Sequence, residues 1–431
     1  MRINDDRWLV PSLVKLAYQR FARDERAKER GTNGRKNHEM PSSNLSFTYT
    51  LEVCTCPLPI APDLDGEFVP PLTPLTHSPW SFPPQCEASS SADIPYYCLY
   101  SNSHQNHLGF SLITTPEVAA EAVSILNSAL PANQVSDPSY KVVDIPGKGK
   151  GVVATRKIKK HEEIMVDYAA LVVDVGFTVG VEVWRGYKMM HLAVDQLSER
   201  GKGDLMGLVR TNPQARDEVE DVLRTNAFST ELGGRTHMAI YTVVSRINHG
   251  CMPNAYTRFM QENLQVSVGA AKDIEKGEEI TISYLVMGKT SDERKKALKQ
   301  WGFQCTCDLC TASPAKIKAS DARRRQIDEL REHAVGAFQA NKPYQALRLT
   351  RQVLNLLPAE ELFTFYSEQY ENMARIFYVL GDKKNAELYA RKSLEVLAEQ
   401  GYLQGVRDKQ VEFMWRKFSM DGDRFGAAAK K

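Results

Sequence analysis

The cysteine-rich segment WGFQCTCDLC, residues 301–310, constrains the fold of this chain more than any other feature of its sequence. It holds Cys305, Cys307 and Cys310, and three thiols so close together cannot all pair with one another. The spacing C-x-C-x-x-C is typical of a zinc-binding loop, but a closed structural zinc site needs four ligands. We favour Cys251, within NHGCMPN at 248–254, as the fourth ligand, with nearby histidines as rivals. A metal is therefore expected to join two distant segments.

The overall composition is that of an ordinary globular protein with two or three domains. The chain has 431 residues, and its 55 Lys and Arg nearly balance its 53 Asp and Glu, which argues against a protein that mainly grips the nucleic acid backbone. No apolar run is long enough for a membrane helix, and the N-terminus lacks the apolar core of a secretory signal. We expect an intracellular protein, with nucleus and cytoplasm not distinguished, and without structural disulfides.

Charge and proline content set the first part of the chain apart. Residues 37–140 contain no Lys or Arg and many prolines, so we expect residues 1–139 to be a largely disordered, Pro/Ser-rich N-terminal region. The spacing of its cysteines matches no known metal pattern, and we expect unpaired thiols rather than a second zinc site. These cysteines are Cys54, Cys56, Cys86 and Cys98.

An internal similarity links KIKKHEEIMVDY (157–168) with DIEKGEEITISY (273–284). Each pattern indicates a strand, a charged turn and a second strand. Many hairpins share this pattern, and we infer no duplicated domain. The turn holds Gly277 in the second copy and His161 in the first, and glycine suits a left-handed turn position better.

Three motifs in order, NHGCMPN, GEEITISY (277–284) and WGFQCTCDLC, resemble the SET-domain protein lysine methyltransferases, and among them the SET and MYND branch. The resemblance implies an α+β fold: a SET-domain β-fold with a knot-like core, a post-SET zinc loop and an all-α, TPR-like C-terminal domain. It implies a SET domain over 140–288 with a helical insert at about 175–228, a post-SET zinc-binding segment over 289–312 and the helical domain over 318–431. Because residues 171–225 hold no cysteine, no MYND finger is expected.

The resemblance also implies roles for single residues. Cofactor contacts are implied for the GKGKG loop, the end of the helical insert, the start of NHGCMPN and an aromatic in the zinc loop. These residues are Lys148, Gly149, Lys150, Asn226, Asn248, His249 and Phe303. Tyr284 resembles the active-site tyrosine, with Tyr241 as its support. Without the resemblance, GKGKG fits a hairpin turn, Asn226 a helix end and Phe303 a core aromatic.

The implied activity is methyl transfer from S-adenosylmethionine to a protein lysine, with zinc in a structural role. The partner is then a protein or peptide that carries a lysine, a histone tail among the candidates. We expect no direct nucleic acid, no membrane and a monomer. A catalytically inactive SET and TPR-like scaffold is the alternative. Two departures bear on this choice: Trp301 stands where the branch commonly has a channel-lining tyrosine, and Gly250 where serine is usual. We interpret the C-terminal helices as a lid rather than a groove for a partner peptide.

Overall fold

The computed structural model describes residues 78–91, 94, 96–128, 138–211, 215–260 and 264–403, and a few positions between 411 and 416. The chain divides into two units, Met1–Thr76 and His77–Lys431, and the described residues all belong to the second. The predicted disorder of residues 1–77 and the predicted free thiols Cys54 and Cys56 lie outside the described residues. In the described part of the chain, no helix is long and apolar enough to cross a membrane.

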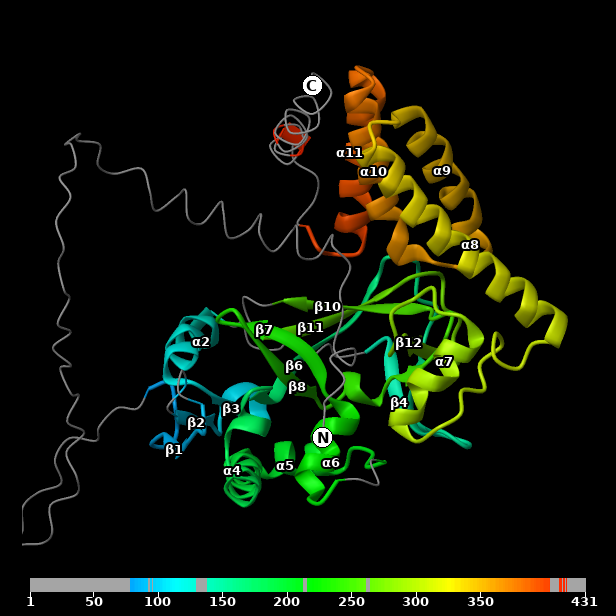
Figure 1. The fold of residues 1–431 in the computed structure, drawn as a ribbon. Helices are drawn as coiled ribbons and strands as arrows, with labels where there is room; N and C mark the ends of the chain where they lie inside the picture. The colour runs from blue at the N-terminus through cyan, green and yellow to red at the C-terminus, as the bar shows by residue number, and fades with distance from the viewer. Residues whose placement is uncertain are drawn as a thin grey trace, which may run out of the picture. The chain divides into compact units, whose positions relative to one another are not determined.

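The core of the described chain is an eight-stranded sheet built around one long strand (Figure 1). This strand, β6 (Glu163–Asp174), is apolar over most of its length because its side chains are buried on both faces. Its first half pairs with β11, and its second half lies between β3 and β8. The other strands are β1 (Gln85–Ala88), β2 (Tyr96–Asn102), β3 (Phe110–Thr114), β7 (Phe228–Leu232), β8 (Arg235–Tyr241), β10 (Ala255–Met260) and β11 (Gln265–Ala270).

The expectation of disorder through residue 139 is wrong for the described residues between 85 and 128. They form β1, β2, β3 and helix α2 (Pro116–Ser128), and side chains such as Tyr97 and Leu112 are fully buried in the sheet. The absence of Lys and Arg here reflects strands covered on both faces rather than a lack of structure. Cys86 and Cys98 lie opposite each other on β1 and β2 and form a disulfide. The prediction of unpaired thiols, and of no structural disulfide, is therefore wrong for this pair.

A second, four-stranded sheet carries the predicted motifs. Its order is β4 (Tyr140–Ile145), β5 (Gly149–Ala154), β12 (Glu279–Ile282) and β9 (Asn248–His249). Strand β9 runs parallel to β12, with Asn248 opposite Thr281 and His249 opposite Ile282. The start of NHGCMPN thus lies beside the end of GEEITISY, although the two motifs are far apart in the sequence.

Helices of the insert cover one side of the main sheet. They are α3 (Phe177–Gly180), α4 (Val183–Asp195), α5 (Glu199–Met206) and α6 (Glu218–Asn226), and in Figure 1 the last three gather below the strands. Their apolar side chains form one cluster with residues of β2, β3, β6 and β8. Helix α6 begins where the Asp217 carboxylate accepts the N–H groups of Val219 and Glu220, and it ends at Asn226.

After residue 290, the described chain is mainly helical apart from the cysteine loop. Helix α7 (Ser291–Leu298) and the short η4 (Lys299–Trp301) precede that loop, and α8 (Pro314–Gln339), α9 (Pro343–Leu356), α10 (Tyr366–Val379) and α11 (Lys383–Glu399) follow it. Helix α8 packs on α9, and α10 on α11. The turn between α10 and α11 contains Gly381 with a left-handed φ of 76°. Ser291 donates its N–H and its hydroxyl to the Asp321 carboxylate, at 2.8 and 2.6 Å, and so joins α7 to α8.

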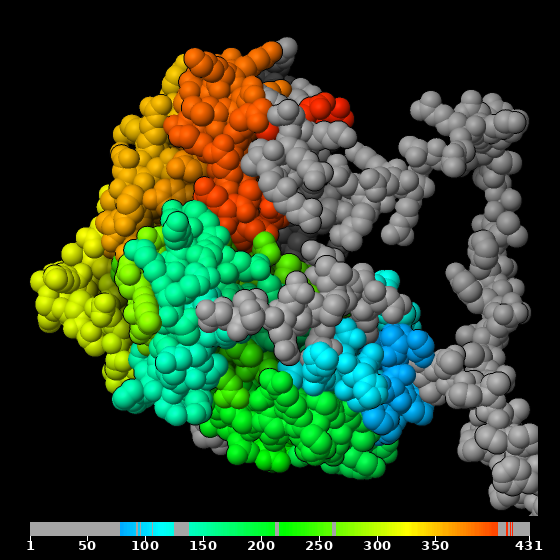
Figure 2. Space-filling view, turned by 180° about the vertical axis from the view of Figure 1, so that it is seen from behind, coloured from blue at the N-terminus to red at the C-terminus, as the bar shows by residue number. Residues whose placement is uncertain are grey.

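The turn at His161 contacts the end of α11. His161 and Gly277 both have left-handed backbones, with φ of 67° and 84°, as their matching places in the internal similarity predict. The His161 Nε2 lies 3.4 Å from the Glu399 carboxylate, and the Tyr256 hydroxyl donates to the Glu399 main-chain oxygen at 2.8 Å. Figure 2 shows the teal segment around β4 and β5 against the orange-red end of α11. A histidine in this turn therefore provides a contact between domains that glycine would lack.

Candidate active site and metal centre

Four cysteine sulfurs lie together beside the second sheet. The sulfurs of Cys251, Cys305, Cys307 and Cys310 are all within 4.8 Å of one another. The Cys251 sulfur is 3.8 Å from that of Cys305 and 3.5 Å from that of Cys310. Four sulfurs placed tetrahedrally at about 2.3 Å from a zinc ion would be about 3.8 Å apart. The structure brings the four predicted ligands together at a spacing that fits zinc.

The electrostatics of this cluster also favour a cation. Hydrogen bonding from the Cys305 sulfur raises the pKa of the Cys251 thiol, whereas the Cys251 sulfur lowers the pKa of Cys307, so the sulfurs compete for protons. A metal cation replaces those protons. Arg294 of α7 is buried beside the cluster; its burial acts to lower its pKa, but the Cys251 sulfur raises it and the net shift is upward. This guanidinium offsets part of the negative charge of four thiolates.

NHGCMPN is fixed to β12 by its own polar groups. The Asn254 carboxamide accepts the Thr281 N–H at 2.8 Å and donates to the Glu279 main-chain oxygen at 2.9 Å. Gly250 donates its N–H to the Ile282 oxygen at 2.9 Å. A Cβ at Gly250 would lie 2.8 Å from the Thr281 hydroxyl oxygen, so glycine in place of the usual serine suits this close approach.

The predicted cofactor loop lies against Asn248. Glu279 joins the two: its carboxylate binds the Lys148 ammonium at 2.6 Å and accepts the Asn248 amide at 2.9 Å. The same amide donates to the Lys150 main-chain oxygen at 3.2 Å. Gly149 has a left-handed φ of 73°, and the space where its Cβ would stand is open. The hairpin and the start of NHGCMPN thus form one surface, joined through the side chains of Glu279 and Asn248.

An aromatic cluster stands between this surface and the cysteines. The Tyr284 hydroxyl donates to the Ile247 main-chain oxygen at 2.7 Å. Its ring centroid is 5.4 Å from those of His249 and Trp301 and 6.3 Å from that of Phe303. Phe303 is nevertheless 39% exposed, and its ring centroid lies 6.3 Å from that of His249. Burial raises the pKa of Tyr284, and the hydroxyl therefore keeps its proton at neutral pH.

Two predicted site residues lie farther out. Asn226, at the end of α6, donates its side-chain amide to two main-chain oxygens, and its own carbonyl accepts the Ser245 hydroxyl at 3.1 Å. Ser245 belongs to the turn that leads into NHGCMPN. Tyr241 is fully buried on β8, with its ring against Phe228 and Phe259. The cofactor role of Asn226 and the catalytic role of Tyr241 stay predictions.

Sequence reasoning missed three charged residues that hold the site. Glu279 lies within GEEITISY but reads there as an ordinary strand residue. Asp167 is buried on β6 and accepts the N–H groups of Val243 and Val244 at 2.8 and 2.9 Å, which fixes the turn before NHGCMPN; burial raises its pKa. A lone Asp in the apolar run IMVDYAALVV signals such partners. Arg294 belongs to a charged run that is typical of a solvated helix face, and that run gives no such signal.

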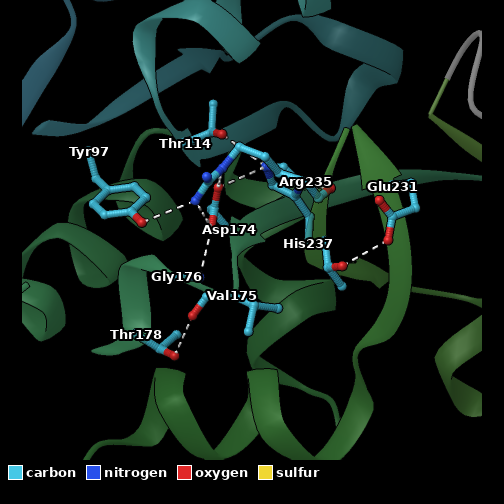
Figure 3. A network of polar contacts seen from close by, with 10 residues as sticks. Tyr97, Thr114, Asp174, Val175, Gly176, Thr178, Glu231, Arg235 and His237 are labelled. Carbon is cyan, nitrogen blue, oxygen red and sulfur yellow. Dashed lines mark hydrogen bonds and ion pairs between the residues drawn. The ribbon is translucent and has the colours of Figure 1, made fainter. Parts of the chain in front are cut away.

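A second polar cluster lies inside the main sheet (Figure 3). His237 is fully buried; its Nε2 lies 2.9 Å from the Thr114 hydroxyl, and its Nδ1 donates to the Arg235 main-chain oxygen at 2.9 Å. Asp174 accepts the Arg235 guanidinium and lies 3.7 Å from the same Nε2. In a nucleophilic triad the acid would bond the opposite ring nitrogen. The cluster therefore stabilises the sheet and offers no hydrolytic site.

Comparisons with known proteins agree with this geometry. A family model described as the SET domain matches residues 191–285, ending one residue after Tyr284. The chain is 28% identical over 262 residues to the histone-lysine N-methyltransferase set5 of Schizosaccharomyces pombe. This match covers 60% of this chain and 78% of that protein. The chain is 35% identical over 119 residues to the histone-lysine N-methyltransferase SMYD3 of Homo sapiens, and 40% identical over 77 residues to the protein-lysine N-trimethyltransferase SMYD5 of Gallus gallus. These two matches cover only 26% and 18% of those proteins, and 25% and 17% of this chain. With its motifs paired on β9 and β12, this chain carries a SET domain and is similar to the SMYD-like lysine methyltransferases.

Proposed function

We propose that this protein transfers a methyl group from S-adenosylmethionine to the side-chain amine of a lysine in a protein substrate. The observation that carries the proposal is the junction at Glu279, whose carboxylate ties the Lys148 hairpin to Asn248. This junction brings the hairpin surface at Gly149, where no side chain fills the space, against the start of NHGCMPN beside the Tyr284 ring. Such a surface suits an adenosyl group, with Phe303 available to stack on the adenine.

Methyl transfer to lysine is a direct displacement, so the enzyme must above all align the reacting atoms. When bound, S-adenosylmethionine supplies the methyl group on a cationic sulfur. The Tyr284 hydroxyl stays protonated and donates a hydrogen bond to the Ile247 main-chain oxygen, so it does not act as a base. Its oxygen lone pairs orient the incoming amine and the methyl group. A lysine amine is charged at neutral pH, and a water-poor wall formed by Tyr284 and Trp301 disfavours that charged form.

Zinc has a structural role in this proposal. Residues 302–313 between η4 and α8 contain no regular helix or strand, so bonds from their cysteines to a metal supply the folding free energy of this loop. The loop follows Trp301 and carries Phe303. Metal binding therefore builds the wall of the site and takes no part in methyl transfer.

The substrate is a lysine-bearing protein, and core histones are the first to test. Two of the relatives described above are named for histone lysine and one for protein lysine. We also propose that the protein is intracellular and monomeric. In this proposal, α8–α11 form a TPR-like domain that acts as a lid on the substrate side.

Calorimetric titration of S-adenosylmethionine tests the cofactor site. Zinc-replete wild type and Tyr284→Phe should bind the cofactor, because the phenol touches the methyl end only. Asn248→Ala should bind at least tenfold more weakly, since it frees both the hairpin and Glu279. Asn385→Ala on α11, which also loses a side-chain hydrogen bond, is the control and should bind normally.

Transfer of a labelled methyl group to core histones, and to peptides with their lysines changed to arginine, tests the reaction. We expect label on the lysine substrates only, and almost none with Tyr284→Phe. A folded, zinc-replete wild type that binds no S-adenosylmethionine would refute the proposal and leave the inactive scaffold as the better description.

A further inference from the structure

The imidazole of His249 contacts two different parts of the site. Its Nδ1 accepts the main-chain N–H of Tyr284 at 3.1 Å. Its Nε2 lies 3.2 Å from the sulfur of Cys251. The side chain is 5% exposed, so both contacts are shielded from water. One ring thus stands between the catalytic tyrosine and the metal centre.

The first contact determines the direction of the second. A main-chain N–H can only donate, so Nδ1 must carry a lone pair, and the proton of a neutral imidazole must be on Nε2. An imidazole with a lone pair on Nδ1 and a proton on Nε2 is neutral, which suits its buried position. The Nε2–H group therefore points at the Cys251 sulfur and donates to it. A thiolate bound to zinc keeps lone pairs that can accept such a bond.

We propose that His249 is a positioning residue whose imidazole couples the zinc site to the catalytic tyrosine by bonding the Cys251 thiolate at one end and the Tyr284 main chain at the other. This role rests on the proposed function and is separate from the main-chain cofactor contact that the resemblance implies for the same residue. Without zinc, the Cys251 sulfur is no longer held as a metal-bound thiolate, and the bond that it accepts from the imidazole weakens. The Tyr284 main chain, and with it the phenol, then becomes less well held.

Two substitutions separate the two ends. The side-chain amide of asparagine stands about where Nδ1 stands, and the amide of glutamine about where Nε2 stands. His249→Asn therefore keeps an acceptor for the Tyr284 N–H and loses the donor to Cys251. His249→Gln keeps the donor to Cys251 and loses the acceptor for Tyr284. A purely structural role of the ring would make the two variants alike.

Zinc affinity and hydrogen exchange measure the two ends without any need for methyl transfer. Zinc affinity comes from competition with a chromophoric chelator, and exchange of the Tyr284 amide comes from mass spectrometry of the peptide around 283–286 in excess zinc. We expect His249→Asn to weaken zinc binding about 10- to 100-fold and to keep Tyr284 protected. We expect His249→Gln to bind zinc within about threefold of the wild type and to exchange the Tyr284 amide at least tenfold faster.

His237 gives the matched control, because it is also fully buried with both ring nitrogens bonded, but lies in the main sheet. His237→Asn and His237→Gln should lower the melting temperature and leave zinc affinity and Tyr284 exchange unchanged. Equal effects of the two His249 variants on both measurements, or effects of the His237 variants as large as theirs, would overturn the proposal. A wild type without methyl transfer would instead refute the proposed function, and these two measurements would still stand.

Discussion

Replacing Glu360 with glutamine tests how the C-terminal helices are held. Its carboxylate is 1% exposed and accepts hydrogen bonds from the Ser320 hydroxyl at 2.6 Å, Arg323 at 2.6 Å and Arg324 at 2.7 Å. Arg324 is also 1% exposed. One of its terminal nitrogens donates to the Lys289 oxygen at 3.0 Å, and the other has no hydrogen-bond partner among the described residues. Glu360 is therefore the neutralising charge of a buried cation.

The size of the effect follows from this burial. Glu360→Gln keeps the shape of the side chain, removes its charge and turns an N–H toward arginine donors. Loss of one partner from a buried ion pair costs roughly 3–5 kcal/mol. Arg323 is 36% exposed and can turn to water, so it adds little. At about 2–4 °C per kcal/mol, the melting temperature should fall by roughly 6–20 °C.

Urea denaturation and thermal melting measure this loss directly. Glu387→Gln is the matched control, because Glu387 pairs with Arg391 along α11 while both side chains are 40% or more exposed. That pair should contribute under about 0.5 kcal/mol. If Glu360→Gln destabilised the protein no more than Glu387→Gln, the buried ion pair would not hold the helices and the reasoning would be refuted.

Three further predictions concern pH, the cofactor loop and zinc. The free energy of unfolding should fall as the pH drops below about 6.5, because burial lowers the pKa of His237 beneath its value in the unfolded chain, and the unfolded chain then binds more protons. Urea melts at pH 7.5 and 5.5 should show a smaller difference in unfolding free energy for His237→Gln than for the wild type, and an equal difference would contradict this. Gly151→Ala should weaken S-adenosylmethionine binding roughly 5- to 150-fold, from about 1–3 kcal/mol of overpacking, because its Cβ would lie 2.8 Å from the Asn248 amide; Gly336→Ala, where the space is open, should bind normally by calorimetry. Chelation of zinc should expose residues 302–313 to protease and abolish methyl transfer, and full activity in verified zinc-free protein would exclude the structural role of the metal.

Local sequence signals predicted the site better than they predicted the fold around it. The spacing of Cys305, Cys307 and Cys310 restricts metal geometry so strongly that the fourth ligand, Cys251, could be inferred across more than fifty residues. By contrast, β2 and β3 lie in a stretch without Lys or Arg, and composition alone cannot separate a strand buried on both faces from an unfolded chain. The disulfide of Cys86 and Cys98 depends on strand register, which no spacing rule reveals.

Charged residues whose partners lie far away in the sequence were the hardest to predict. Glu279 and Asp167 each stand beside apolar residues as any strand residue does, and only their partners, 31 or more residues away in the sequence, show what they hold. His249 illustrates the same limit from the other side. The NHGCMPN motif predicts that His249 is functional. The role of its imidazole, however, depends on the hydrogen bond from the Tyr284 main chain, and only the parallel pairing of β9 and β12 brings these two residues together.

The supports of the site continue from Tyr284 into the C-terminal helices. The Lys289 oxygen accepts from Arg294, at 2.7 Å, and from Arg324 of α8, at 3.0 Å. Arg294 also lies beside the cysteine sulfurs, whereas Arg324 depends on Glu360 for its charge balance. The segment that links Tyr284 to the cysteine loop is therefore held from the helical side as well as from the cysteine cluster. Helix α8 is thus joined to the framework of the proposed active site, and a change at Glu360 should lower the rate of methyl transfer even at temperatures where the protein stays folded.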